Sequence, residues 1–281
     1  MSDLRIILLV LSFFLCLFSK AQLSGDTFNS ANKSKQAQLI YVYNNATDFA
    51  KENDKGEVSG VLVDLMKEFE EYVAEEYEID LRVDFVQIEQ ANFAEFLTAV
   101  QSSNGGVFGL SNTSISEERK KFLQFSQPFM SNILVLVTHK NVTELRSMSE
   151  ISKQFVDMKA LSVTSSIYLK SLKKIKDKYY PDMEIVHHKS GLDVIEALAE
   201  DEKGFAIVDL LYYFDYFKKG YPIKRHKIGD ESGDDFGIIM PPDSDWKAVL
   251  DSFFETGFLQ SPKYREIVSN HLGKSSLRLI R

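Results

Sequence analysis

The sequence predicts an α/β protein built in two lobes, and two observations lead to this prediction. Short apolar runs typical of strands alternate with segments whose apolar residues recur at helical spacing, which is the pattern of parallel sheets with crossover helices. The alternation occurs twice along the 281 residues, and a further strand and two closing helices follow the second set. We expect a ligand to bind where the carboxyl ends of the strands of the two lobes face each other.

The N-terminal residues 1–21 are predicted to be a signal peptide. Arg5 precedes the apolar run IILLVLSFFLCLF, which is too short to span a bilayer comfortably. Ser19 and Ala21 then supply the small side chains of a cleavage site, and an uncleaved anchor is the alternative. The polar residues 22–37 are expected to form a flexible lead-in. The protein is therefore expected to be exported, to the periplasm or the extracellular space.

The first set of elements alternates strand and helix. The apolar positions Leu62, Leu65 and Phe69 recur at helical spacing, and Gly105 and Gly106 follow the second helix as a stop. The expected elements are the strand LIYVY (39–43), the helix VSGVLVDLMKEFEEYVAEEY (58–77), the strand LRVDFVQI (81–88), the helix NFAEFLTAVQSS (92–103), and the strands VFGL (107–110) and NILVLVTH (132–139).

The second set repeats the alternation and leads into the closing helices. Its expected strands are ALSV (160–163), EIVHH (184–188), GFAIVD (204–209) and FGIIM (236–240), the last of which stops at Pro241 and Pro242. Its expected helices are SIYLKSLKKIKDKYY (166–180), GLDVIEALAEDE (191–202), LLYYFDYFKK (210–219), DWKAVLDSFFETGFL (245–259) and PKYREIVSNHLG (262–273). We expect the first lobe to comprise residues 38–132 with 238–281, and the second lobe 133–237.

Charge and cysteine content exclude several classes of function. The 41 acidic and 33 basic residues give a formal charge of −8, which argues against a nucleic-acid-binding protein. Cys16 lies within the predicted signal peptide, so the rest of the chain has no disulfide and no thiolate nucleophile. The five histidines are not spaced as metal ligands. We therefore expect no metal and no cofactor.

The segment SISEERKKFLQFSQPF contains the strongest candidate for a binding residue, Arg119. A guanidinium is a planar donor that matches a carboxylate in a bidentate way. Ser114 and Ser116 precede it like the start of a helix, where free N–H groups favour an anion. The alternative is that Ser116 only caps a helix and that Arg119 is a surface cation paired with Glu117 or Glu118.

Four segments in this order resemble the family 3 bacterial extracellular solute-binding proteins of the amino-acid-binding type, and the related ligand-binding domain of ionotropic glutamate receptors. They lie within residues 38–273 and read GVLVDLMKEF, SISEERKKFLQFSQPFMSNILVLV, GFAIVD and FGIIMPPDSDWKAVLDSFF. The resemblance implies the two-lobed, type II fold of periplasmic binding proteins, in which the chain crosses twice between lobes and the ligand cleft lies between them. The crossings are expected near residues 131–133 and 236–237.

The resemblance also assigns ligand contacts to individual residues. The family pattern is Thr-x-Thr-x-x-Arg followed by Phe-Ser-x-Pro and an aromatic residue, and it implies that Arg119 and the hydroxyl of Ser114 bind the α-carboxylate of the ligand. It implies that Asp209 and the backbone of Asn112 bind the α-ammonium. For Asp209, an N-cap role at the following helix is the alternative reading, and both roles can coexist.

The remaining assigned residues belong to a turn and to two aromatic walls. Thr164, Ser165 and Ser166 occupy the turn that meets the distal end of the ligand in the family, although the usual glycine is missing and a helix cap is the alternative. Phe93 and Tyr43 are the expected aromatic walls, with ordinary core packing as the alternative.

The resemblance implies a binding protein rather than an enzyme. We expect a monomer that captures an amino acid or another small carboxylate by hinge closure, for ABC-type uptake through a membrane permease or for sensing through a receptor. One alternative is a lyase of the cyclohexadienyl dehydratase type on the same fold, for which Asp209 is a candidate acid or base. The other is a sensory or accessory module that binds a partner protein.

Overall fold

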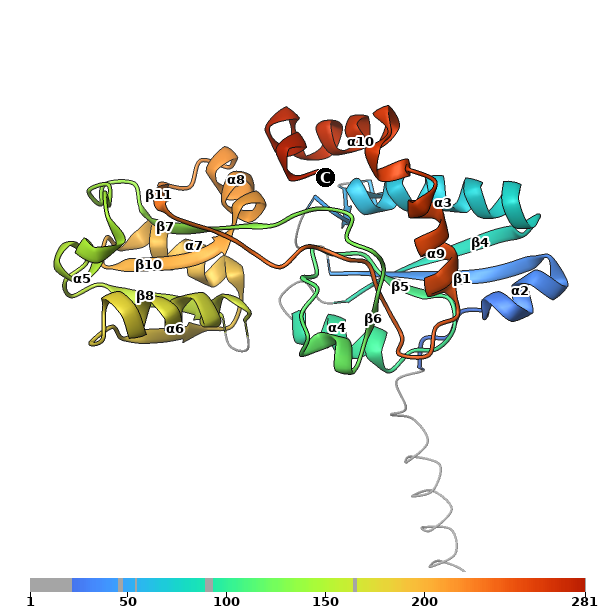
Figure 1. Cartoon of the computed structure of the whole chain (residues 1–281), viewed down its shortest axis with the longest axis horizontal. Helices are drawn as coiled ribbons and strands as arrows, with labels where there is room; N and C mark the ends of the chain where they lie inside the picture. The colour runs from blue at the N-terminus through green and yellow to red at the C-terminus, as the bar shows by residue number, and fades with distance from the viewer. Residues whose placement is uncertain (1–21, 45–47, 54, 89–92, 164–165, 281) are drawn as a thin grey trace, which may run out of the picture.

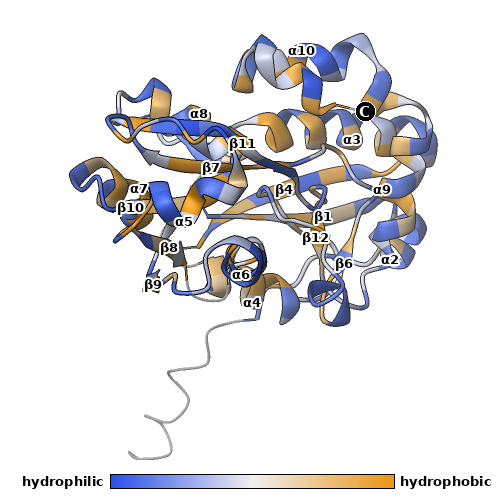
Figure 2. Ribbon diagram, turned by 60° about the vertical axis from the view of Figure 1, so that its left-hand side comes forward, coloured by the Kyte–Doolittle hydropathy of each residue, from blue (hydrophilic) through white to orange (hydrophobic). Residues whose placement is uncertain are grey.

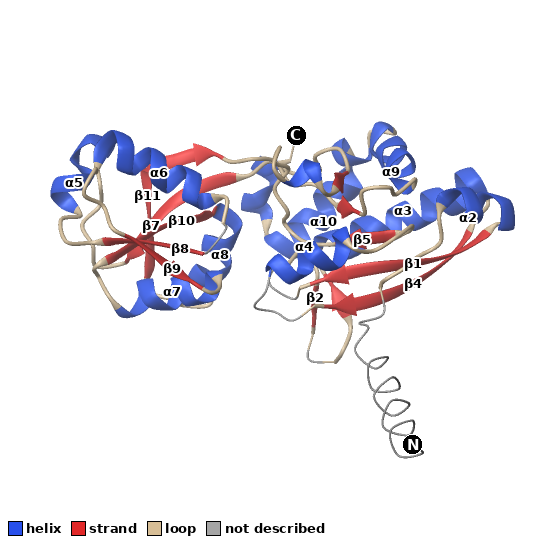
Figure 3. Ribbon diagram, turned by 90° about the horizontal axis from the view of Figure 1, so that it is seen from below, coloured by secondary structure: helices blue, strands red, loops and turns tan. Residues whose placement is uncertain are grey.

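The computed structural model describes residues 22–44, 48–53, 55–88, 93–163 and 166–280. The protein has two lobes, each built around a five-stranded sheet with helices on its faces (Figure 1). Figure 3 shows the two sheets from below, well separated along the long axis of the molecule. The two-lobed α/β fold predicted from the sequence is confirmed. None of the helices in the described part of the chain is long and apolar enough to cross a membrane.

The sheet of the first lobe has the strand order β4-β1-β5-β12-β6. The first three strands are parallel, and β12 runs antiparallel to both of its neighbours. Its strands are β1 (Gln36–Tyr43), β4 (Asp80–Gln87), β5 (Val107–Gly109), β6 (Gln124–Phe125) and β12 (Ile239–Met240). Its helices are α2 (Phe28–Ser34), α3 (Val61–Tyr77), α4 (Phe93–Gln101), α9 (Trp246–Glu255) and α10 (Pro262–Leu272). A small hairpin is formed by β2 (Lys51–Glu52) and β3 (Val58–Ser59).

The sheet of the second lobe has the strand order β11-β7-β10-β8-β9. Strand β7 is antiparallel to both β10 and β11, whereas β10, β8 and β9 are parallel. Its strands are β7 (Ile133–His139), β8 (Lys159–Val163), β9 (Ile185–His188), β10 (Gly204–Asp209) and β11 (Ile223–Ser232). Its helices are α5 (Ile151–Gln154), α6 (Tyr168–Tyr179), α7 (Gly191–Glu200) and α8 (Leu210–Lys218).

Short 3₁₀ helices occur in both lobes. They are η3 (Met148–Glu150) in the second lobe and η2 (Arg119–Lys121), η4 (Phe258–Gln260) and η5 (Lys274–Leu279) in the first.

The hydrophobic core of the first lobe lies between its sheet and helices α3 and α9. Phe69 of α3 packs edge-on against Phe108 of β5 and Trp246 of α9, with ring centroids 6.0 and 6.3 Å apart. All three side chains are fully buried, and burying one large apolar side chain contributes about 1.5–3 kcal/mol. Figure 2 shows hydrophobic residues along the central strands and mixed faces on helices such as α3 and α10. The amphipathic pattern therefore decides which helix face meets the sheet.

The lead-in expected to be flexible over residues 22–37 is instead ordered from residue 22 onward. Thr27 caps α2 by accepting from the Ser30 N–H at 3.2 Å. The Asp245 carboxylate accepts from the N–H groups of Phe28 and Asn29 at 2.7 and 2.9 Å. The expectation was wrong because polar residues that look like a linker in sequence find partners more than 200 positions away. The predicted signal peptide lies outside the described residues.

Two hydrogen-bonded segments carry the chain between the lobes, as the resemblance implied. The Phe236 N–H donates to the Met130 carbonyl at 2.9 Å, and the Phe129 N–H donates to the Phe236 carbonyl at 3.0 Å. The Gly233 N–H donates to the Asn132 carbonyl at 3.1 Å. The two crossings therefore form a short antiparallel ribbon.

The C-terminal segment adds a third connection between the lobes. The Ser131 N–H donates to the Leu279 carbonyl at 2.8 Å. The guanidinium carbon of Arg278 lies 5.7 Å from the ring centroid of Phe214 on α8, within the range of a cation–π contact. Segment η5 therefore contacts both the crossing region and the second lobe.

A buried histidine connects β11 to the loop after β7. His226 is fully buried, and its Nδ1 accepts from the Leu145 N–H at 2.9 Å. Its Nε2 therefore carries the hydrogen and donates to Thr138 Oγ1 at 2.7 Å. Burial, and then the charge of Lys224, lower the pKa of His226 to about 4.

We predict that His226 makes the stability of the protein depend on pH. The pKa of His226 is about 6.5 in the unfolded chain and about 4 in the folded protein. Between these two pH values the unfolded state binds more protons, so the stabilisation that the neutral His226 provides is complete above pH 6.5 and is lost as the pH falls towards 4. In urea denaturation, His226→Asn should lower the free energy of unfolding at pH 7.5. The difference in the free energy of unfolding between wild type and His226→Asn should be about 2 kcal/mol smaller at pH 5 than at pH 7.5.

The matched control is His187→Asn, because His187 is an exposed histidine in the same lobe. This variant should leave the free energy of unfolding unchanged at both pH values. A constant difference between wild type and His226→Asn across this range would contradict the prediction.

Candidate functional site

Arg119 opens the short helix η2 and is half-buried. Its Nη1 donates to the Ser114 carbonyl at 3.1 Å. Its guanidinium carbon lies 5.1 Å from the ring centroid of Phe93, which opens α4. Burial lowers the pKa of Arg119, and the nearby Tyr168 and Asp209 act in the opposite direction. The side chain stays a cation, held in place by a carbonyl and an aromatic face.

The residues just before Arg119 give it this position. Ser116 Oγ accepts from the Arg119 N–H at 3.3 Å, so Ser116 caps the turn as the sequence suggested. Glu117 pairs with Lys120 at 2.7 Å, and Glu118 acts on Arg119 only as a nearby charge. The alternative in which Arg119 is a surface cation paired with Glu117 or Glu118 is therefore not what the structure shows.

Asp209 ends β10 and is buried, with 2% of its surface exposed. Its Oδ1 accepts from Asn132 Nδ2 at 2.6 Å. Its Oδ2 accepts from the Tyr168 hydroxyl at 2.7 Å and from Asn112 Nδ2 at 3.1 Å. The side chain makes no capping bond to α8, although Asp209 occupies the N-cap position. Its contacts are thus directed towards the boundary between the lobes.

The three donors to Asp209 come from three different parts of the chain. Asn112 lies in the first lobe after β5, Asn132 lies in a crossing segment directly before β7, and Tyr168 opens α6 in the second lobe. Burial raises the pKa of Asp209, and hydrogen bonds from Tyr168, then from Asn132, act to lower it. We call Arg119, Asp209, Asn112, Asn132 and Tyr168 the junction cluster.

Tyr168 is a hydrogen-bond donor in this cluster. Burial, and then the charge of Asp209, raise the pKa of Tyr168 well above its usual value, so the phenol stays protonated. The charge of Arg119 acts in the opposite direction on the pKa of Tyr168 and also lowers the pKa of Asp209. The cation and the carboxylate therefore face the same region from opposite lobes.

The structure brings some of the other expected site residues to this region. Phe93 lies against Arg119, as described above. Ser114 is buried and holds Arg119 through its backbone carbonyl. Ser166 Oγ accepts from the Tyr168 N–H at 3.1 Å and so fixes the start of α6. Thr164 and Ser165, the other two residues of that turn, lie outside the described residues.

Tyr43 lies in a different environment. Its ring packs edge-on against Phe85, and its hydroxyl donates to Glu52 at 3.3 Å and Gln87 at 3.5 Å. Tyr43 belongs to the core cluster shared with α3, whereas Phe93 packs on the cluster that faces α4. These contacts place Tyr43 on the other side of the sheet from Phe93.

Two members of the junction cluster were missed by the sequence analysis. Asn132 is a polar residue directly before an apolar strand, a weak signal that an adjacent buried partner exists. Tyr168 gave no signal, because its partner Asp209 is 41 positions away and on another element. Only the packing of α6 beside the end of β10 brings the two together.

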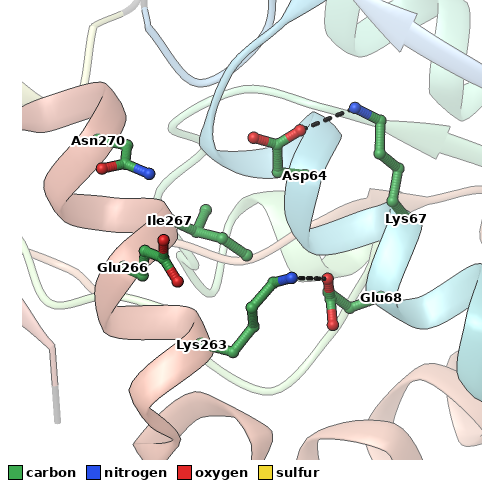
Figure 4. Close-up of a pocket in the computed structure, with 7 residues that line it drawn as sticks. All are labelled: Asp64, Lys67, Glu68, Lys263, Glu266, Ile267 and Asn270. Atoms are coloured by element: carbon green, nitrogen blue, oxygen red, sulfur yellow. Dashed lines mark hydrogen bonds and ion pairs between the residues drawn. The ribbon is translucent and has the colours of Figure 1, made fainter.

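A separate cavity of about 290 Å³ lies between α3 and α10 (Figure 4). Lys67 bonds Asp64 at 2.9 Å, and Lys263 bonds Glu68 at 3.0 Å, so these cations already have anionic partners. The cavity is lined by Asp64, Lys67, Glu68, Lys263, Glu266, Ile267 and Asn270. It is a charged groove between two helices of the first lobe, and none of its lining residues belongs to the junction cluster.

Comparison with known proteins gives one family and a group of solved structures. The family model described as bacterial extracellular solute-binding proteins, family 3, matches residues 39–274. An ancestral arginine-binding protein bound to arginine superposes with a TM-score of 0.65 at 18% identity, over 84% of this chain and 98% of that chain. A putative binding component of an ABC transporter from Wolinella succinogenes, complexed with lysine, gives a TM-score of 0.67 at 14% identity, over 84% and 95%.

A third similar structure is an ancestral amino-acid-binding protein described as a precursor of cyclohexadienyl dehydratase. It gives a TM-score of 0.66 at 16% identity, over 87% of this chain and 98% of that chain. At these identities the three likenesses concern the fold.

Proposed function

The chain belongs to the bacterial extracellular solute-binding proteins of family 3, and we propose that it captures a small, carboxylate-bearing, amino-acid-like ligand between its lobes. The observation that supports this proposal is the setting of Arg119. Its guanidinium has five N–H donors, and the bond to Ser114 uses one of them. Each charge-assisted hydrogen bond to a sheltered carboxylate contributes about 1.5–3 kcal/mol.

Capture proceeds by hinge closure. The ligand first places its carboxylate on Arg119 and Ser114 in the first lobe, and then the second lobe approaches with Thr164, Ser165 and Ser166, the residues that the resemblance assigns to the distal end of the ligand. The ribbon formed by the two crossings is the natural hinge, because it is the part of the chain that joins the sheets. Closure follows only to the extent that the closed form binds the ligand better than the open form.

The biological setting is proposed on the same basis. We propose that the protein is exported, acts as a monomer, and passes its ligand to a membrane permease or signals to a receptor. The family description and the transporter-related structure from Wolinella succinogenes support this setting. The division into lobes at 38–132 with 238–281 and 133–237 is supported by the membership of the two sheets.

A second candidate function is a lyase acting on cyclohexadienyl acids. It is favoured by one observation, a buried carboxyl with a raised pKa, Asp209, close enough to Arg119 for their charges to interact. Such a carboxyl can act as a general acid beside an anchored carboxylate. Its three hydrogen bonds argue against this role, because a proton donor must be free to reach the substrate.

We predict that the protein does not turn over prephenate. Purified protein is incubated with prephenate, and the aromatic product is followed by ultraviolet absorbance. We expect no product above the spontaneous rate. Many turnovers per protein molecule, abolished in Asp209→Asn, would establish the lyase in place of the binding protein.

We predict that Arg119→Ala abolishes ligand capture without unfolding the protein. A thermal-shift screen of amino acids and small carboxylates identifies a ligand that raises the melting temperature of wild type. Loss of the two or more charge-assisted bonds should weaken its binding by about 100-fold or more, measured by calorimetry. The circular dichroism spectrum should stay unchanged.

Lys263→Ala is the matched control, since it removes a cation from the α3–α10 groove instead. It should keep the ligand-induced shift of wild type. An equal shift in wild type and Arg119→Ala would exclude Arg119 as the anchor of the carboxylate.

A further inference from the structure

The contacts of Asp209 narrow the class of ligand. We infer that Asn112, Asn132 and Tyr168 occupy the Asp209 carboxylate in place of a ligand ammonium, so that the site takes carboxylates without an α-ammonium group. The ligand class rests on the proposed function, but the occupation of Asp209 does not. This inference replaces the ammonium contact that the sequence resemblance assigned to Asp209, and it narrows the amino-acid-like ligand of the proposed function to one that shares the carboxylate of an amino acid but not its α-ammonium group.

The acceptor capacity of Asp209 is nearly used. A carboxylate offers about four lone-pair positions, and three of them receive the side chains of Asn132, Tyr168 and Asn112 at 2.6, 2.7 and 3.1 Å. With 2% of its surface exposed, Asp209 has almost no open side for a further donor. One acceptor position, on Oδ1, remains, so an ammonium group with its three N–H donors can place at most one of them on Asp209 unless it displaces one of these bonds.

The three donors are themselves held in place. Ser111 Oγ donates to Asn112 Oδ1 at 3.4 Å, which turns the amide nitrogen of Asn112 towards Asp209. Asn132 is buried, and its backbone carbonyl accepts from the second crossing segment. Tyr168 starts α6, with its N–H bonded to Ser166. Asn132 and Tyr168 belong to a crossing segment and to the second lobe, so their bonds to Asp209 do not require closed lobes, whereas the bond from Asn112 forms only when the lobes meet.

Replacing Asp209 with a neutral amide changes the stability of the ligand-free protein in opposite directions, depending on whether the carboxylate is an open ammonium site or is already bonded to Asn112, Asn132 and Tyr168. A buried carboxylate that waits for a cation carries an unrepaid desolvation cost, so replacing it with a neutral amide stabilises the free protein. In this chain Asp209→Asn leaves the Nδ2 groups of Asn112 and Asn132 and the hydroxyl of Tyr168 beside an amide, which can accept fewer hydrogen bonds than a carboxylate. Neutralising Asp209 should therefore destabilise the ligand-free protein.

The first test uses the ligand-free protein. Thermal unfolding is compared for wild type, Asp209→Asn and Tyr168→Phe. We expect both variants to lower the melting temperature by about 3 °C or more. The control Asp243→Asn neutralises an exposed acid of the first lobe and should change it by less than about 1 °C. An unchanged or higher melting temperature in Asp209→Asn overturns the occupation of Asp209.

The second test uses matched ligands that differ only in the α-ammonium group. The pairs are L-glutamate with glutarate, L-leucine with 4-methylpentanoate, and L-arginine with 5-guanidinopentanoate, measured by calorimetry. We expect the partner that lacks the ammonium to bind wild type at least as tightly. An amino acid that binds 10-fold more tightly than its partner overturns the ligand class.

Tyr168→Phe gives this test a readout that a merely structural residue would not change. Removing the phenol frees one acceptor position on Asp209, so the amino acid of each pair should gain affinity relative to its partner by about 10-fold. An unchanged ratio in this variant overturns the role of Tyr168. Failure of every carboxylate to bind wild type contradicts the proposed function and the ligand class together, while the first test still decides the occupation of Asp209.

Discussion

One buried carboxylate, that of Asp209, is bonded to both lobes and to a crossing segment. Asp209 is the end of the central strand β10, and a charge at that depth is tolerated only when donors meet it. The donors come from the first lobe, from a crossing segment and from the second lobe. One carboxylate therefore receives hydrogen bonds from three parts of the molecule, and the bond from Asn112 adds a contact between the lobes to those of the crossing segments and of η5. Packing alone would not set this contact, because apolar surfaces have little directional preference.

Arg119, the charged residue of the first lobe, also has partners that offset the cost of burying its charge. Its charge is sheltered by Phe93 and bonded to the Ser114 carbonyl, so the cation is held in place before any ligand arrives. A preorganised cation loses less conformational entropy on binding than a mobile surface arginine. The first lobe thus holds a cation that is fixed by Ser114 and Phe93. The second lobe holds a carboxylate that already accepts three hydrogen bonds.

The sequence predicted most of the helices and strands because their apolar periodicity is strong. It missed β11, whose residues IKRHKIGDES are largely polar and form an edge strand that needs little apolar surface. It also missed α2, which depends on Asp245 and on the indole of Trp246, whose Nε1 donates to the Asp26 carbonyl at 2.8 Å. In both cases the stabilising partner is far away in the chain, so no local pattern could reveal it.

The sequence by itself determined the family and the two-lobed α/β fold, because apolar periodicity and short motifs are local properties of the chain. The tertiary structure decided which residues surround the two charges. Asn132 and Tyr168 meet Asp209 only after β7, β10 and α6 have packed, and Tyr43 turns to Phe85 on the far side of the sheet from Phe93. The physical reason is that a buried charge selects its partners by distance in space, and folding brings together residues that the sequence keeps 41, 77 and 97 positions apart.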